Sequence, residues 1–284
     1  MSKITVSKLW KMKEKGEKIT MTTAYDYPTA LLVEKAGLEM ILVGDSVGMV
    51  VLGYDNPVPV TVDDIIHHTK AVVRGAKKPF IVADMPFMSY HISPEETKRN
   101  AARIIQEGGA DAVKLEGGKE VAPMVKAIAD VGIPVQAHIG LMPQRASVGG
   151  SFKVQGKDAE TAKAILEDAM ALEEAGAFSV VIEFVTTEAG KLITEGLKMP
   201  TIGIGAGPHC DGQVVLSHDL LGYYETQPPF VKLYADLNET ITDAFKAFKT
   251  DVRASKYPDM AHSVAMDKKE AEKTIKNISV LLEE

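Results

Sequence analysis

The segment AVKLEGG, residues 112–118, is a short apolar run that ends in an acid, Glu116, followed by two glycines. Three further runs share this form and read LVGD, IVAD and VVIE. They end in Asp45, Asp84 and Glu183. Nearly continuous apolar runs are typical of parallel strands that are covered on both faces. We therefore expect a parallel sheet whose strands carry carboxylates at their carboxyl ends.

Eight apolar runs recur along the chain, alternating with glycine-rich or polar loops and helical patterns. They cover Thr20–Tyr25, Met40–Val43, Phe80–Ala83, Ala112–Leu115, Val135–His138, Phe178–Ile182, Thr201–Ile204 and Val214–Ser217. Alternating strands and helices predict an α/β protein with a parallel sheet. Eight units favour closure into a (β/α)8 barrel of the TIM type over the alternative, an open doubly wound sheet.

Three helix starts are marked by local signals. Thr61–Asp64 resembles a capping box, with an acid at the third helical position. Ser93–Glu96 places proline at the first helical position. Residues 159–175 have apolar residues at helical spacing and stop at a glycine.

Two segments lie outside the repeating unit. Residues 6–15 and the part after about residue 222, including residues 267–282, have helical patterns. The length of 284 residues suits one barrel, which typically needs about 250. We expect a single domain, residues 1–284, with extra N-terminal and C-terminal helices that cap the barrel or contact another subunit.

The composition restricts the class of function. Hydrophobic residues make up 45% and charged residues 25%, which indicates a packed core. A net charge of -7 with scattered basic residues argues against binding nucleic acid or an acidic membrane. We find neither a signal-peptide pattern nor an apolar stretch of membrane-spanning length. The single cysteine, Cys210, excludes a disulfide framework, and we expect it to be passive in a cytoplasmic protein.

The four strand-end acids, Asp45, Asp84, Glu116 and Glu183, are expected at the mouth of the barrel, where this fold places its active site. Each acid taken singly could instead cap the helix that follows. Several carboxylates in one partly buried cup are costly without a cation. Carboxylate ligands without a cysteine cluster suit Mg²⁺, which would need two or three of them. The remaining acid is then free to act as a base.

Two other polar residues belong to the strands. Because side chains alternate along a strand, Lys114 shares the inner face with Glu116, where it could hold a substrate carboxylate or stabilise an enolate oxygen. On an exposed edge strand the two would only form a surface ion pair. His138 ends the fifth run and is either catalytic or a hydrogen-bonded core residue. We expect His67 and His68, within a helix, on the surface.

Two glycine-rich loops are less informative. GIGAG, residues 203–207, follows the seventh run, where barrels often bind phosphate, although glycine also serves tight turns. GGSFKVQG, residues 149–156, lies between the fifth run and its helix. Its flanking glycines suit a movable lid, and an ordered connection is the alternative.

Seven segments together resemble the 3-methyl-2-oxobutanoate hydroxymethyltransferase (ketopantoate hydroxymethyltransferase) family. They are TAYDYPTA (23–30), LVGDSVGMVVLGYDNPVPVT (42–61), ADMPFMSY (83–90), VKLEGG (113–118), HIGLMPQ (138–144), GGSFKVQG (149–156) and GIGAGPHCDGQVV (203–215). The segments occur in this order, and the resemblance as a whole covers roughly residues 3–262. This makes it much more specific than any one motif.

The resemblance implies a (β/α)8 barrel enzyme that transfers a one-carbon, hydroxymethyl unit. The donor would be the co-substrate 5,10-methylenetetrahydrofolate and the acceptor 3-methyl-2-oxobutanoate, so both are small molecules. The product would be 2-dehydropantoate, on the route to pantothenate and coenzyme A. The resemblance also implies a homo-oligomer, with ten subunits.

The resemblance further implies the metal site. Asp45 and Asp84 match ligands of Mg²⁺ and of the oxo acid, and Glu116 matches a third carboxylate around the metal. Mg²⁺ chelated by the oxo acid would stabilise the enolate that forms on loss of the C3 proton.

The remaining roles are also implied by position in the motifs. Ser46 and Lys114 match contacts to the substrate carboxylate, and His138 matches a pocket histidine. Glu183 matches the general base that removes the C3 proton, so that the carbanion attacks the one-carbon unit. Its apolar sequence neighbours are consistent with the raised pKa that a glutamate base needs near neutral pH.

Three features depart from the family pattern: Met142 often has a threonine counterpart, EFVTTE (183–188) often reads differently, and the tail after about residue 262 is long.

One alternative is a Mg²⁺-dependent lyase or mutase of the phosphoenolpyruvate mutase and isocitrate lyase type. Those enzymes commonly carry a reactive cysteine in a Lys-Cys-Gly-type loop, which this sequence lacks. The other alternative, a catalytically silent barrel, conflicts with the intact acids.

Overall fold

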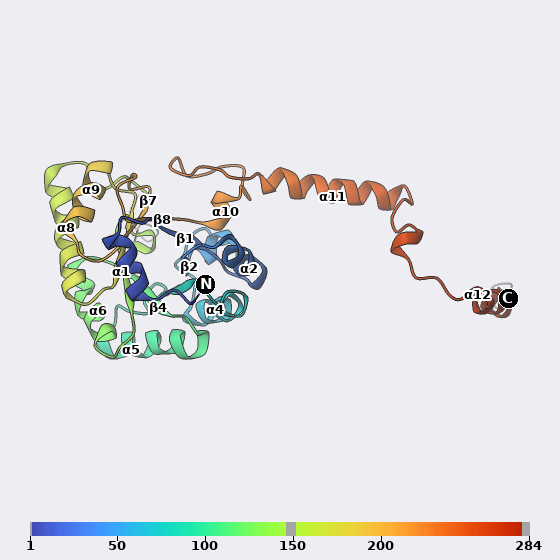
Figure 1. Ribbon diagram of the computed structural model, residues 1–284, viewed down its shortest axis with the longest axis horizontal. Coiled ribbons are helices and arrows are strands. Elements are labelled where there is room, and N and C mark those ends of the chain that lie inside the picture. Colours follow the sequence, from blue (N-terminus) through green and yellow to red (C-terminus); the bar gives the residue numbers. More distant parts are fainter. Residues whose placement is uncertain (1, 146–151, 280–284) are drawn as a thin grey trace. The chain divides into compact units, whose positions relative to one another are not determined.

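The computed structural model, which describes residues 2–145 and 152–279, is a closed barrel of eight parallel strands (Figure 1). Each strand pairs with the next in chain order, and β1 closes the ring by pairing with β8. The strands are β1 Ile19–Thr23, β2 Met40–Val43, β3 Phe80–Asp84, β4 Ala112–Glu116, β5 Val135–Gly140, β6 Ser179–Glu183, β7 Thr201–Ile204 and β8 Gly212–Val215. The predicted (β/α)8 barrel is confirmed, and the open sheet is excluded.

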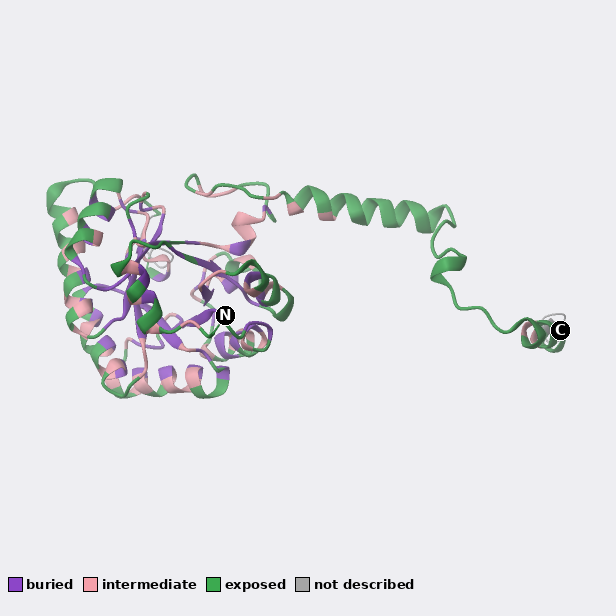
Figure 2. Ribbon diagram, in the orientation of Figure 1, coloured by how far each residue is buried: buried purple, intermediate pink, exposed green. Residues whose placement is uncertain are grey.

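Helices surround the ring of strands, with their buried residues turned toward it (Figure 2). They are α2 Tyr27–Ala36, α3 Val47–Val50, α4 Val62–Gly75, α5 Pro94–Arg103, the π-helix η1 Ile104–Gly108, the 3-10 helix η2 Lys119–Val121, α6 Ala122–Ala129, α8 Ala159–Glu174, α9 Thr187–Gly196 and α10 Ser217–Leu220. None of the helices within residues 2–145 and 152–279 is long and apolar enough to cross a membrane.

The eighth unit differs from the prediction. Residues 205–211, all of them described, connect β7 to β8 as a loop, so the alternation of strand and helix is interrupted there. The eighth strand begins two residues earlier than expected, because Gly212 and Gln213 pair with β1. It also ends earlier, because Ser217 is already the first residue of α10.

The predicted helix starts are confirmed. In front of α4, the Thr61 hydroxyl accepts from the Asp64 amide at 3.2 Å, and the Asp64 carboxylate accepts from the Thr61 amide at 2.9 Å. Ser93 caps α5 by accepting from the Glu96 amide at 3.2 Å. Helix α8 begins after an Asp158 cap and ends at Glu174. These caps satisfy amides that the first turn of a helix leaves without partners.

An N-terminal helix, α1 (Val6–Glu14), packs against the residues that fill the inside of the barrel. Leu9 is fully buried in this inner cluster. The Trp10 indole N–H donates to the Phe178 carbonyl at 3.0 Å, and Lys13 contacts Asp211 at 2.8 Å. The extra N-terminal helix is thus part of the packed core and lies at the end of the barrel away from the strand-end acids.

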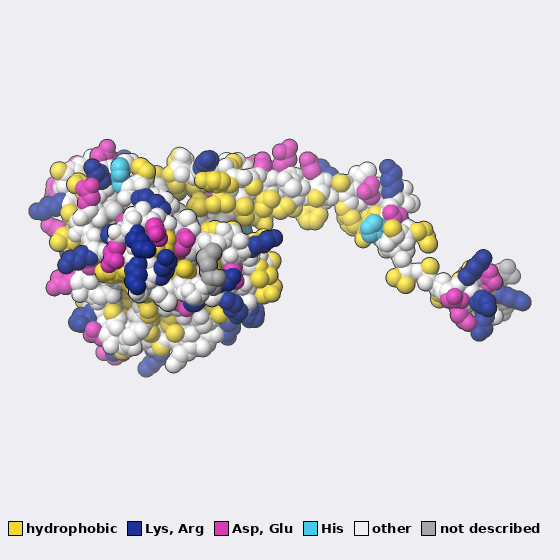
Figure 3. Space-filling view, viewed as in Figure 1, with side chains coloured by type: hydrophobic (Ala, Val, Ile, Leu, Met, Phe, Trp, Pro, Cys, Tyr) yellow, Lys and Arg dark blue, Asp and Glu magenta, His cyan; other side chains and the backbone are white. Residues whose placement is uncertain are grey.

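The chain divides into two compact units, Met1–Tyr234 and Ala235–Glu284. The second contains α11 (Leu237–Arg253), the 3-10 helix η3 (Met260–His262) and α12 (Lys268–Ser279), which are the expected C-terminal helices. No residue is buried in its described part, and apolar side chains, including Phe245, Phe248 and Val252, are exposed along α11 (Figure 3). A single domain spanning residues 1–284 stays a prediction.

Replacing Leu9 with alanine should lower the free energy of unfolding by about 2–5 kcal/mol, because a fully buried leucine leaves a cavity in the inner core. Urea titration followed by circular dichroism measures the loss. Lys11→Ala changes an exposed position of the same helix and should be close to neutral. Equal losses in the two variants would show that α1 contributes only as a surface helix.

Candidate active site

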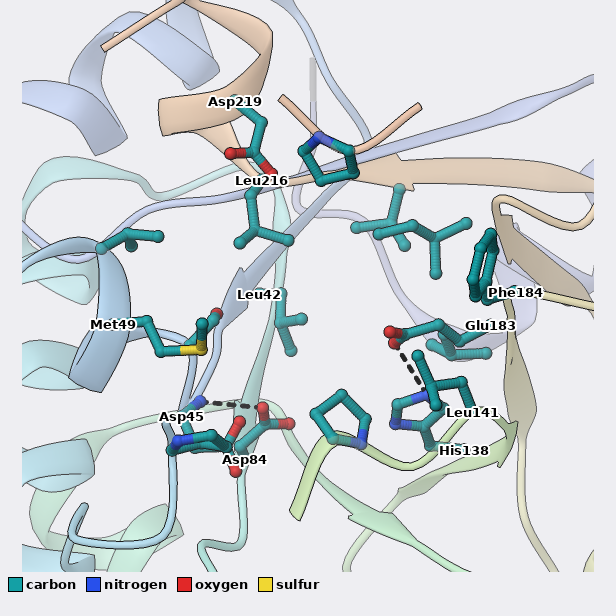
Figure 4. Close-up of a pocket in the computed structure, with 18 of the residues that line it drawn as sticks. Leu42, Asp45, Met49, Asp84, His138, Leu141, Glu183, Phe184, Leu216 and Asp219 are labelled. Carbon is teal, nitrogen blue, oxygen red and sulfur yellow. Dashed lines mark hydrogen bonds and ion pairs between the residues drawn. The ribbon is translucent and has the colours of Figure 1, made fainter. Parts of the chain in front are cut away.

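A cavity of about 700 Å³ opens at the carboxyl ends of the strands (Figure 4). Parallel strands that close into a barrel bring their last residues to one rim, so acids distant in sequence meet there. All seven predicted site residues line this cavity: Asp45, Ser46, Asp84, Lys114, Glu116, His138 and Glu183. Their predicted convergence is confirmed, whereas their individual roles stay predictions.

The first cluster joins β2, β3 and β4. Lys114 Nζ lies 2.7 Å from Asp84 Oδ1, and both side chains are at most 5% exposed. Asp84 Oδ2 accepts from the Asp45 backbone amide at 2.9 Å. Burial lowers the pKa of Lys114, but Asp84 and Glu116 more than offset this and raise it above its usual range. Lys114 is therefore a fixed positive charge on the inner face, as the strand alternation predicted.

The second cluster is centred on His138. Its Nε2 lies 3.1 Å from a carboxylate oxygen of Glu183, and its Nδ1 lies 3.5 Å from Glu116. Burial and Lys114 lower the pKa of His138, but its contacts to Glu116 and Glu183 prevail and raise the pKa to about 9. When protonated, the ring forms ion pairs with both acids. Figure 4 shows Glu183 and His138 across the cavity from Asp45 and Asp84.

Gln144, beside the site acids, is a buried polar residue whose role the sequence does not predict. Its side-chain amide donates to Asp45 at 2.8 Å and to the Met85 carbonyl at 3.1 Å. Its side-chain oxygen accepts from the Tyr90 hydroxyl at 2.7 Å, and its backbone amide donates to Glu116 at 3.2 Å. A buried glutamine thus holds two of the site acids. The only signal in the sequence was a polar amide shortly after a strand end.

Ser46 has a partner that was also missed. Its hydroxyl lies 2.8 Å from the Tyr25 hydroxyl, which follows β1. Tyr25 is buried, and burial raises the pKa of its hydroxyl well above the usual range. Tyr25 therefore stays neutral and can orient Ser46 toward the cavity.

The acids suit a divalent cation. When all are ionised, four carboxylates against one lysine and one histidinium leave an excess of two negative charges. Burial, followed by repulsion from Asp84 and Glu116, raises the pKa of Asp45 well above its usual range. Such a group gains from a nearby cation.

The carboxylates are not equally free to bind an ion. Among residues 2–145 and 152–279, no three His, Cys, Asp or Glu side chains are grouped closely enough to enclose one by themselves. Glu116 already contacts His138 and Gln144 with its two oxygens. Asp84 is also engaged through both oxygens, by Lys114 and by the Asp45 amide. Asp45 accepts through Oδ2 from Gln144 and is therefore the least engaged of the three carboxylates. Mg²⁺ commonly takes one or two carboxylates together with substrate and water oxygens.

Other expectations have mixed outcomes. His67 is exposed as predicted, but His68 is half-buried, with Nδ1 2.7 Å from the Tyr25 carbonyl, so its assignment to the surface is wrong. Cys210 is fully buried, and burial raises the pKa of its thiol, which favours the unreactive form. Of the predicted lid loop, residues 149–151 lie outside the described residues, while Phe152 lines the cavity.

Solved structures of other proteins share this barrel fold. Phosphonopyruvate hydrolase is similar with a TM-score of 0.62 and 12% identity over 99% of each chain. 2,3-Dimethylmalate lyase, a member of the phosphoenolpyruvate mutase and isocitrate lyase superfamily, is similar with a TM-score of 0.57 and 14% identity over 98% of this chain and 95% of that chain. At these identities the likeness shows the fold alone.

Sequence comparisons are more specific. The model of the ketopantoate hydroxymethyltransferase family matches residues 3–260, so the chain belongs to this family. Proteins named 3-methyl-2-oxobutanoate hydroxymethyltransferase from Thermoanaerobacter sp. (strain X514) and Geobacillus kaustophilus (strain HTA426) are 54% and 56% identical. The matches cover 94% and 91% of this chain and 98% and 93% of those proteins. The resemblance is confirmed, and the chain is a transferase.

Stability should depend on pH through His138. Its pKa is about 9 when folded and near 6.5 when unfolded, so the folded state binds the proton more tightly. The resulting stabilisation is complete below about pH 6.5 and disappears as the pH rises through about 9, on the order of 3 kcal/mol in all.

This pH dependence is tested by comparing the unmodified protein with His138→Gln, whose side chain cannot titrate. In metal-free protein, urea titrations should show the stability advantage of the unmodified protein shrinking between pH 6 and pH 9.5. His67→Gln, at an exposed position, is the control and should show no such trend. If the difference in the free energy of unfolding between the unmodified protein and His138→Gln stays constant over this range, the two acids do not hold the histidine protonated.

Proposed function

We propose that this chain transfers a hydroxymethyl unit from 5,10-methylenetetrahydrofolate to 3-methyl-2-oxobutanoate, giving 2-dehydropantoate for pantothenate and coenzyme A synthesis. Family membership supports the activity. The observation that carries the chemistry is the division of the cavity: a buried lysine–aspartate cluster on one side faces a half-buried glutamate on the other. One side can hold an oxo acid while the other removes its proton.

The oxo acid needs positive charge and hydrogen-bond donors. We assign its carboxylate to Lys114 Nζ, which is held in place by Asp84, and to the Ser46 hydroxyl, which is held by Tyr25. Mg²⁺ held by Asp45 and Asp84 would supply the positive charge that makes the C3 proton more acidic. The third assigned ligand, Glu116, fixes His138 and Gln144 in this arrangement.

Glu183 is assigned the proton transfer. Among the cavity carboxylates that form ion pairs, the Glu183 side chain is the most exposed, at 16% of its surface, so a substrate can reach it. His138 contacts it at 3.1 Å and can hold its carboxylate in a fixed orientation. Once Glu183 has taken the C3 proton, C3 forms a bond to the one-carbon unit of the donor. Both bonds from that carbon to the folate nitrogens break, and water supplies the hydroxyl oxygen. The proton taken from C3 and one proton of the water end on the two nitrogens as tetrahydrofolate leaves.

Two further assignments follow the family resemblance. We propose that the chain assembles into a homo-oligomer, with ten subunits as the resemblance implies, and that it acts in the cytoplasm. The exposed apolar side chains along α11 are consistent with subunit contacts, but they do not specify the number.

Metal dependence is tested by calorimetry of oxo-acid binding. Binding of 3-methyl-2-oxobutanoate should require Mg²⁺, disappear with a chelator and return when Mg²⁺ is restored. Asp84→Asn keeps the shape of the side chain but loses its charge, so affinity should fall at least tenfold because Asp84 holds both Lys114 and the ion. Asp55→Asn, at an exposed position, is the matched control. Unchanged affinity in Asp84→Asn would remove Asp84 from this role.

Proton removal can be separated from one-carbon transfer. With Mg²⁺ and no folate, the protein in deuterated water should exchange the C3 hydrogen of 3-methyl-2-oxobutanoate, observed by proton NMR. Glu183→Gln cannot accept the proton, so exchange should fall by roughly 10²–10⁴-fold, while oxo-acid binding persists. Glu188→Gln, exposed at the start of α9, should exchange normally. Full exchange in Glu183→Gln would assign the base to another group, with His138 tested next.

A further inference from the structure

One carboxylate of the cavity has no part in the reaction described so far. Asp219, in α10, is half-buried and lines the cavity. Across residues 2–145 and 152–279, no hydrogen bond or ion pair reaches its carboxylate. Burial raises the pKa of Asp219 above its usual range, and no neighbouring cation counteracts this. A carboxylate in this position loses hydration without gaining a partner.

The cavity that Asp219 lines is largely apolar and also has aromatic walls. Tyr224, Phe230 and Phe184 are among its lining residues. The Tyr224 hydroxyl donates to the Val50 carbonyl at 2.8 Å, and the rings of Phe184 and Phe230 lie 5.2 Å apart. These contacts fix ring faces against which a flat ligand can pack.

The position of Asp219 separates it from the metal side. In Figure 4, Asp219 lies at the far end of the cavity from Asp45 and Asp84, with the side chains of Leu42 and Leu216 between them. A volume of about 700 Å³ suits a drug-sized ligand, much larger than a five-carbon oxo acid. The cavity therefore has room for a second, larger ligand on the apolar side.

We propose that Asp219, with the ring faces of Tyr224 and Phe230, forms the subsite for the bicyclic ring of the folate donor. This rests on the function proposed above. The carboxylate accepts hydrogen bonds from the amino group and the adjacent ring N–H of the pyrimidine, and the aromatic side chains pack on the ring.

The chemistry of the two partners matches. The aminopyrimidine edge presents two parallel N–H donors, which a carboxylate accepts with its two oxygens in the way it accepts a guanidinium. This edge is at the opposite end of the ring system from the nitrogen that carries the one-carbon unit. A ring held at Asp219 by this edge therefore directs the reactive nitrogen toward Glu183 and the oxo acid.

A simpler explanation for Asp219 is an acid that favours the first turn of a helix. Helix α10 has only four residues, Ser217–Leu220, so its dipole is small. No backbone amide donates to the Asp219 side chain in the described part of the chain. The carboxylate also lines the cavity instead of lying on the outer surface, which favours a ligand over a helix cap.

The test measures tetrahydrofolate binding by calorimetry under reducing conditions. Asp219→Asn keeps the size of the side chain but sets an amide N–H against the ligand's donors, so affinity should fall about 10–100-fold, as for lost charge-assisted hydrogen bonds. Glu225→Gln, exposed outside the cavity, should bind normally. Oxo-acid exchange without folate should stay unchanged in both variants.

An analogue in which a methyl group replaces the 2-amino group identifies the contact. It should bind the unmodified protein more weakly than tetrahydrofolate does, whereas Asp219→Asn should discriminate much less between the two ligands. Equal discrimination in both proteins, or unchanged tetrahydrofolate affinity in Asp219→Asn, overturns the subsite.

The same measurements separate the subsite from the proposed function. If the unmodified protein exchanges and converts the oxo acid but Asp219→Asn binds tetrahydrofolate normally, the subsite alone is wrong. If tetrahydrofolate binds through Asp219 but no hydroxymethyl transfer occurs, the proposed function is wrong and the subsite stands. If the unmodified protein does not bind tetrahydrofolate at all, both are wrong.

Discussion

The buried ion pair between Asp84 and Lys114 is the interaction on which the rest of the site depends. The two residues are direct partners in the register of β3 and β4, so the pairing of these neighbouring strands brings the charges together. Each would be strongly destabilising if buried alone. Because the second oxygen of Asp84 accepts from the Asp45 amide, the same pair also determines where the chain turns after β2.

The two sides of the cavity differ in how their acids are held. Asp45 has a raised pKa because it lies near other carboxylates in a buried place, which makes it a group that gains from a cation. On the other side, Glu183 has a protonated histidine at 3.1 Å. Burial alone would raise the pKa of Glu116. Its contacts to His138 and Lys114 outweigh burial, so the pKa lies below its usual value. Glu116 is thus a permanent anion between the two sides, which keeps His138 charged.

Much of the fold and of the site could be predicted from the sequence, because both follow from a simple periodicity. Apolar runs ending in acids determine the strand direction and the rim, and the alternation along β4 correctly placed Lys114 beside the acids. The eighth strand was misplaced because glycine and glutamine at its start have little strand character, and only pairing with β1 defines it. Gln144 and His68 were missed because their partners are 28 to 99 residues away in the sequence. Local patterns have no information about such contacts.

The placement of α1 also has a consequence for how the chain reaches its folded state. Its contacts join residues far apart along the chain: Trp10 meets Phe178 across 168 positions, and Lys13 meets Asp211 across 198. Helix α1 must therefore wait for the sixth, seventh and eighth strands before its apolar face can be buried. Folds dominated by such distant contacts form slowly, because loop closure is unfavourable before the contacts are made. Until those strands are in place, the apolar face of α1 stays exposed to water.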